Sequence, residues 1–95
     1  MNSFGEYLRG KREQLELPLR KVAAELDIDT SILSKIERNE RAATKEMLPI
    51  LSKVLAIPEK ELEVEFIKST ILSQFGELNY LSVGLEETLS ILNKR

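Results

Sequence analysis

Short hydroxyl side chains and cations share one side of a predicted helix between residues 30 and 38. With Leu33 and Ile36 facing inward, the outward positions are Thr30, Ser31, Ser34 and Lys35. A helix that enters the major groove of DNA, about 12 Å wide, needs such a small polar surface. Lysine suits guanine O6 and N7, and a hydroxyl can bind either base edge. We therefore expect these four residues to contact bases, against the plainer alternative of a solvated helix face.

Further cations flank this segment. They are Arg20, Lys21, Arg38, Arg41 and Lys45. Cations beside a groove-binding helix meet phosphates, which position a protein without reading the sequence. We expect three of the five to do so and two to be solubilising charges. The first 45 residues hold nine Lys/Arg and eight Asp/Glu, whereas the remaining residues hold five Lys/Arg and eight Asp/Glu. The acidic surplus that gives the net charge of −2 therefore lies in the second half of the chain, away from the predicted helix 30–38.

The sequence lacks residue types on which many enzymes depend. The chain has no cysteine and no histidine, which excludes a disulfide, a thiolate zinc site and every nucleophile system based on these residues. Glu59, Glu61, Glu63 and Glu65 lack the glycine and the ligand spacing of a calcium-binding EF-hand loop. We expect no enzyme, no metal and no cofactor. Neither a signal peptide nor a membrane span is recognisable, so the expected location is cytoplasmic.

Capping and turn signals predict five or six helices and no confident strand. Ser3 and Glu6 form a capping box that starts the first helix, and Pro49 should bend the fourth helix or delay its start. The predicted helical ranges are 3–15, 18–26, 30–38, 44–56 and 58–75, with a short last helix around Leu85, Leu89 and Leu92. Gly76 and Gly84 should bracket the break before it.

The segment 61–66 is ambiguous. Its residues alternate with the period of a strand, but Leu62, Phe66, Ile67, Ile71 and Phe75 fit a helix equally well, and Pro58 favours the helix.

Two short helices joined at residues 27–29 can pack against each other at a steep angle only if their inner positions are apolar or small. Val22, Ala23 and Leu26 supply one inner face, and Ile28 plugs the turn. Leu33 and Ile36 supply the other face. This arrangement predicts a helix-turn-helix.

The segment Leu19–Arg38 resembles the helix-turn-helix of the lambdoid phage repressor and Cro class, the xenobiotic-response-element regulators. The similarity runs from about Phe4 to Leu62, with Leu48 and Pro49 resembling the fourth helix of phage repressors. It implies an all-α, five-helix, lambda-repressor-like DNA-binding domain. The resemblance also implies that Arg12 and Glu37 form a structural ion pair.

Two residues depart from the family pattern. The family usually has a phosphate-binding glutamine where Leu19 stands, so Arg20 or helix amides must substitute. The turn glycine is Asp27 here, and aspartate tolerates the left-handed conformation better than most residues. Residues 17–24 also resemble a subgroup associated with restriction-modification systems.

These features predict a DNA-binding domain at residues 1–62 and a C-terminal helical extension at residues 63–95. The extension holds more apolar residues than a five-helix core needs, namely Leu78, Tyr80, Leu81, Leu85, Leu89 and Leu92. We expect them to form a homodimer interface, and the alternative is a cap on the same subunit.

The expected function is a sequence-specific transcription regulator. It would be a repressor that binds a pseudo-palindromic double-stranded DNA operator as a homodimer. One alternative is a restriction-modification controller, and another is an antitoxin whose C-terminal segment binds a toxin partner.

Overall fold

The computed structural model describes residues 3–95, and every regular element within them is helical. The elements are α1 (Phe4–Gln14), α2 (Leu19–Glu25), α3 (Thr30–Glu37), the 3-10 turn η1 (Lys45–Met47), α4 (Leu48–Val54), α5 (Glu59–Phe75) and α6 (Leu81–Asn93). The predicted all-α fold is confirmed, and the ambiguous segment 61–66 is helix.

Several predicted boundaries need correction. Pro18 is the N-cap of α2 instead of a residue of its first turn. The fourth helical segment is divided, because η1 precedes α4 and Pro49 lies in the first turn of α4. Gly84 lies inside α6 and does not border the break, since Tyr80 is already the N-cap and the helix runs to Asn93. The break therefore covers only residues 76–80.

Within residues 3–95, four helices end on a non-glycine residue in the left-handed region: Glu16 (φ 56°), Asp27 (56°), Asn39 (62°) and Ala56 (53°). At each end the next amide donates to the carbonyl five residues back, as from Leu17 to Arg12 (3.1 Å) and from Ile28 to Ala23 (3.0 Å). These bonds satisfy the last helical carbonyls. The backbone geometry is the one that glycine usually supplies.

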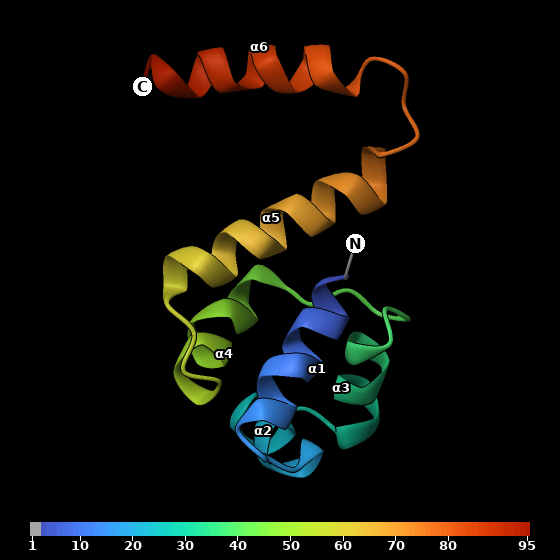
Figure 1. Cartoon of the computed structure of the whole chain (residues 1–95), viewed down its shortest axis with the longest axis vertical. Helices are drawn as coiled ribbons and strands as arrows, with labels where there is room; N and C mark the ends of the chain where they lie inside the picture. The colour runs from blue at the N-terminus through green and yellow to red at the C-terminus, as the bar shows by residue number, and fades with distance from the viewer. Residues whose placement is uncertain (1–2) are drawn as a thin grey trace.

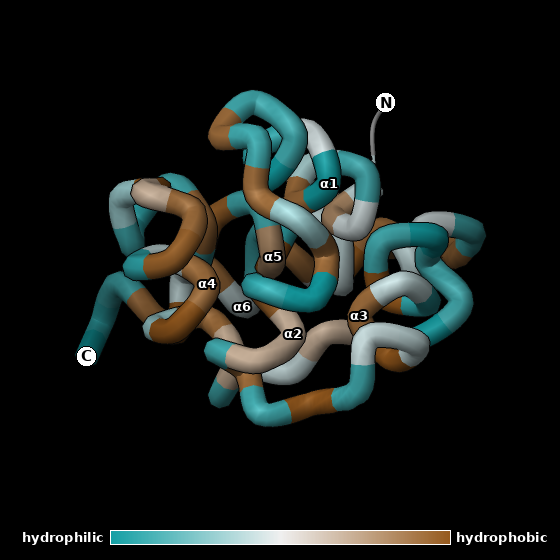
Figure 2. The backbone as a smooth tube through the Cα atoms, turned by 90° about the horizontal axis from the view of Figure 1, so that it is seen from below, coloured by the Kyte–Doolittle hydropathy of each residue, from teal (hydrophilic) through white to brown (hydrophobic). Residues whose placement is uncertain are grey.

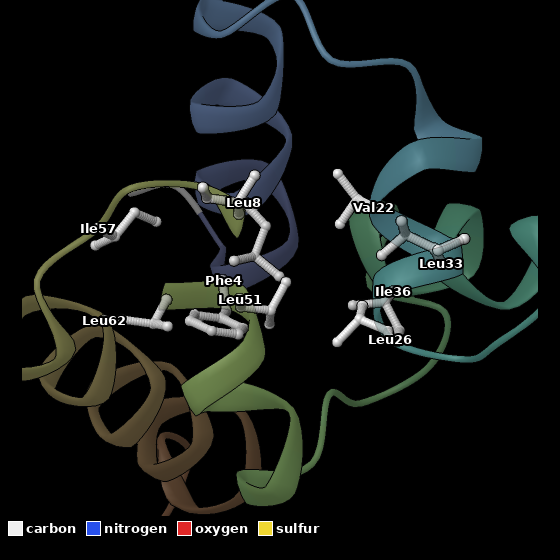
Figure 3. Packing of buried hydrophobic residues seen from close by; sticks show 11 residues of the cluster. Phe4, Leu8, Val22, Leu26, Leu33, Ile36, Leu51, Ile57 and Leu62 are labelled. Atoms are coloured by element: carbon white, nitrogen blue, oxygen red, sulfur yellow. The ribbon is translucent and has the colours of Figure 1, made fainter. Parts of the chain in front are cut away.

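The core lies between α1 and the helices on either side of it (Figure 3). Phe4 and Leu8 of α1 belong to one buried cluster with Leu51 and Leu62 and with the apolar residues of α2 and α3. The buried cluster comprises Phe4, Leu8, Val22, Ala23, Leu26, Leu33, Ile36, Leu51, Leu55, Ile57 and Leu62. Every residue predicted for the inner faces of the two short helices is among them.

Helix α5 lies between the cluster of α1–α4 and α6, as Figure 1 shows. Its first half packs on the core through Leu62 and Phe66, and its second half extends past the N-terminus of α1. The predicted domain boundary after residue 62 falls inside this continuous helix. None of the described residues of α6 is buried.

Candidate nucleic-acid interface

Helices α2 and α3 pack directly against each other. Ala23 and Val22 are both about 1 % exposed at this contact, and Ile28 packs partly buried in the turn. The small Ala23 side chain lets the two backbones approach. Seen from below (Figure 2), the outer edge of the chain beside α3 is mostly hydrophilic.

The predicted base-contacting residues lie on this outer side of α3. Thr30, Ser31 and Lys35 are exposed, and Ser34 is half-buried. Lys35 forms no ion pair with any residue between 3 and 95. Its ammonium group therefore needs no internal bond to be broken before it binds a ligand.

All five predicted phosphate-binding cations are exposed. Lys21 pairs with Glu25 on the same helix (3.4 Å), and Arg38 pairs with Glu40 (3.4 Å). Such exposed pairs are worth at most about 1 kcal/mol, so a phosphate can replace the carboxylate. Arg20, Arg41 and Lys45 have no acidic partner within the described part of the chain.

Arg12 and Glu37 form an ion pair across the core. Arg12 Nε donates to Glu37 Oε2 at 2.7 Å and Nη2 donates to Oε1 at 3.0 Å, while Nη1 donates to the carbonyl of Leu17 at 2.9 Å. The side chains are only 14 % and 7 % exposed. The hydrogen bond to Glu37 raises the pKa of Arg12. One guanidinium thus fixes the end of α3 to α1 and to the chain that leads into α2.

A second contact between α1 and α3 is not apparent from the sequence. The Gly5 amide donates to Asn39 Oδ1 at 3.3 Å, just beyond the end of α3. A Cβ atom on Gly5 would lie 2.2 Å from the Ile36 carbonyl oxygen and 2.7 Å from that of Glu37. Only glycine fits here, because the opposing atoms belong to backbone.

A polar cluster joins α1 to α5, and no pattern in the sequence indicates it. The Tyr7 hydroxyl donates to Glu61, whose carboxylate also lies 3.6 Å from Lys11 Nζ. Lys11 lies over the Tyr7 ring at 5.5 Å. Burial and the bond to Glu61 raise the pKa of Tyr7, while the Tyr7 hydroxyl and then Lys11 lower the pKa of Glu61.

No group of acids within residues 3–95 is arranged to hold an ion. No helix in that range is long and apolar enough to cross a membrane.

A model of the helix-turn-helix family matches residues 8–62, which include most of α1, all of α2 to α4 and the start of α5. The chain belongs to this family. It is a DNA-binding transcription regulator of the lambda-repressor-like, xenobiotic-response-element type, and this class of domain is regulatory, not typically enzymatic. No curated protein and no solved structure gave a significant match.

The residues predicted for the dimer interface lie outside the matched range. In this helix-turn-helix regulator Leu78 and Tyr80 are exposed in the break before α6. Leu85, Leu89 and Leu92 are exposed on α6, and Leu81 is half-buried at its start. No described residue of α6 is buried in the single chain.

Proposed function

We propose that this regulator binds a pseudo-palindromic operator as a homodimer and represses transcription. The observation that carries the proposal is the outward face of α3. It presents Thr30, Ser31 and Lys35 to solvent on a helix whose other side is buried and whose end is fixed by Arg12. A recognition helix must combine an exposed polar face with a fixed orientation, because base contacts tolerate little displacement.

In this proposal α3 lies in the major groove. Lys35 reaches a guanine, and the hydroxyls of Thr30, Ser31 and Ser34 contact neighbouring base edges. The cations at 20, 21, 38, 41 and 45 bind phosphates on either side of the groove. Leu19 packs against the core, so the phosphate contact that a glutamine would make falls to Arg20.

A single helix-turn-helix reads few base pairs, so useful specificity requires two copies. Their recognition helices would lie roughly 34 Å apart, which is one turn of DNA. The matching arrangement on DNA is a pair of inverted half-sites. A dimer bound across a promoter would exclude polymerase and thereby repress transcription.

The test begins with selection of the preferred site from random duplexes, followed by affinity measurements with Lys35→Ala. We expect this variant to lose about 1–3 kcal/mol of affinity for the selected site and little for unrelated DNA. Lys53→Ala is the matched control, since Lys53 is an exposed lysine on α4, outside the proposed interface.

Equal losses on selected and unrelated DNA would make Lys35 a phosphate contact. Failure of the unaltered chain to enrich any sequence would refute the operator proposal.

The exposed apolar residues of α6 favour one second candidate, an antitoxin whose C-terminal segment binds a toxin. Copurification of a stoichiometric second protein when the chain is expressed with its neighbouring genes would support it. The sequences of those neighbouring genes would show whether they encode a restriction-modification system.

A further inference from the structure

Helix α5 carries two apolar faces. One packs on the core through Leu62 and Phe66. The other lies on the opposite side, where Val64, Ile67 and Phe75 are exposed with Ile71 between them, at the spacing of one helical stripe. A helix that is apolar on both sides is normally covered on both sides.

Helix α6 provides a matching surface. Most of its apolar residues form one broad stripe, composed of Leu81, Leu85, Leu89, Ile91 and Leu92, whereas Val83 lies on the other side of the helix. The start of this stripe faces the end of α5, because Leu81 and Leu85 line a cavity of about 560 Å³ together with Phe75. From this point the two helices diverge (Figure 1). We call the outer stripe of α5 and the stripe of α6 together the apolar V.

The single chain leaves the apolar V largely uncovered. Leu85, Leu89 and Leu92 are 40–57 % exposed, and Val64, Ile67 and Phe75 are 44–46 % exposed. If a large apolar side chain offers roughly 150–200 Å² when fully exposed, the V exposes on the order of 700 Å². Each partner buries about 800 Å² in a standard stable interface, within a range of roughly 600–1,000 Å². The V is therefore large enough to support a dimer.

We propose that the apolar V is filled by α6 of a second copy of this chain, so that two α5 and two α6 helices form a four-helix bundle. The inference rests on the homodimer of the proposed function and specifies how it is built. It adds the outer face of α5 to the interface, whereas the sequence alone predicts interface residues only after residue 76. Closed dimers are commonly two-fold symmetric, with each surface meeting its own copy.

The charges of α6 determine the direction of pairing. Glu86 and Glu87 lie in its first half, whereas Lys94 and Arg95 lie at its end. In an antiparallel pair with Leu85 opposite the partner's Leu92, the acids of each copy lie near the cations of the other. A parallel pair would place like charges side by side, which is unfavourable. The α6 helices therefore pair antiparallel, with Leu89 near the two-fold axis.

Cysteine cross-linking of the full chain tests this arrangement directly, because the natural sequence has no cysteine. We expect Leu89→Cys to form a disulfide-linked homodimer under mild oxidation, since a residue near the axis meets itself. Leu92→Cys alone should remain unlinked, whereas a mixture of Leu85→Cys and Leu92→Cys should link. Asn93→Cys, beside Leu92 but on the polar side of α6, is the matched control and should stay unlinked.

The role of α5 is tested by sedimentation of Ile67→Glu. Ile67 lies outside the core cluster, so the variant should keep its helical circular dichroism and its binding to unrelated DNA, yet sediment as a monomer. Ser73→Glu, which adds the same carboxylate at an exposed position on the opposite side of α5, should remain a dimer. A dimeric Ile67→Glu protein would remove the outer face of α5 from the interface.

Self-linking of Leu92→Cys would overturn the antiparallel direction in favour of a parallel pair. An unaltered chain that is monomeric at tens of micromolar concentration and gives no cross-links would overturn the proposal, leaving α6 to close on its own α5 or to bind a different protein. The cross-linking and sedimentation measurements contain no DNA, so a failure of operator binding leaves them unaffected.

Discussion

Two glycines of the same helix should respond in opposite directions to the same substitution. Gly5 and Gly10 both lie in α1. A Cβ on Gly5 would lie 2.2 Å from the Ile36 carbonyl oxygen, whereas a Cβ on Gly10 would meet nothing within 4 Å. The Ile36 carbonyl also accepts a hydrogen bond from the Asn39 amide at the end of α3, so it cannot move without disturbing that end of the helix.

The expected magnitudes follow from this difference. In an exposed helix interior, alanine is favoured over glycine by about 0.5–1 kcal/mol, and Gly10→Ala should stabilise the fold by that amount. Gly5→Ala receives a similar benefit but must displace two backbone carbonyls, and overpacking of a filled site costs about 1–3 kcal/mol or more. We expect a net loss of about 2 kcal/mol. For a domain of this size, the thermal midpoint should fall by about 8–16 °C in Gly5→Ala and rise by about 2–8 °C in Gly10→Ala.

Urea denaturation and thermal unfolding followed by circular dichroism measure both changes, and operator titration adds a functional readout. Gly5→Ala should also weaken operator binding under conditions where the variant is fully folded, because α3 must shift. Gly10→Ala should leave operator binding unchanged. Equal midpoints for Gly5→Ala and the unaltered chain would refute the close approach of α1 and α3.

Three further results are expected. Arg12→Ala should destabilise the fold by about 3–5 kcal/mol, because it leaves the Glu37 carboxylate buried without a partner. Arg9→Ala breaks an exposed ion pair on the same helix and should cost under about 1 kcal/mol. Equal urea midpoints for the two variants would contradict the structural role of Arg12. The pKa of Glu61 lies below its ordinary value of 4.5, so the ionised carboxylate stabilises the fold above that pH, and this stabilisation is lost as pH falls through the lowered pKa. Tyr7→Phe should therefore lose less stability than the unaltered chain between pH 7 and pH 3. An unchanged loss would speak against the hydrogen bond between Tyr7 and Glu61. If each subunit contacts three or four phosphates, operator affinity should fall with salt at a log-log slope of about −5 to −7, and a slope near zero would exclude the phosphate contacts.

The helical architecture was predictable because local patterns and the resemblance agreed. Every apolar position assigned to the inner faces of the two short helices is buried or partly buried. The capping box at Ser3 starts α1 as expected, with the Glu6 amide donating to Ser3 Oγ at 3.1 Å. Periodicity and capping act over a few residues, so they can be read along the chain.

Helix ends were less predictable where they depend on unusual backbone. The left-handed residues Glu16 and Ala56 carry no glycine signal. Each is followed by a buried or half-buried apolar residue, Leu17 or Ile57, so packing of the next side chain fixes the turn. Segment 61–66 was ambiguous for a related reason: α5 has apolar residues on two sides, which obscures the helical period.

The sequence by itself determined the fold class, the helix-turn-helix and the polar face of its second helix, because each depends on residue type at short spacing. It did not distinguish Gly5 from Gly10, and it did not connect Tyr7 with Glu61 or the outer face of α5 with α6. These relations join residues that are 31 to 54 positions apart, as between Gly5 and Ile36 or between Tyr7 and Glu61, or that lie on different helices. They depend on how helices cross, and the crossing is fixed only when the whole core packs.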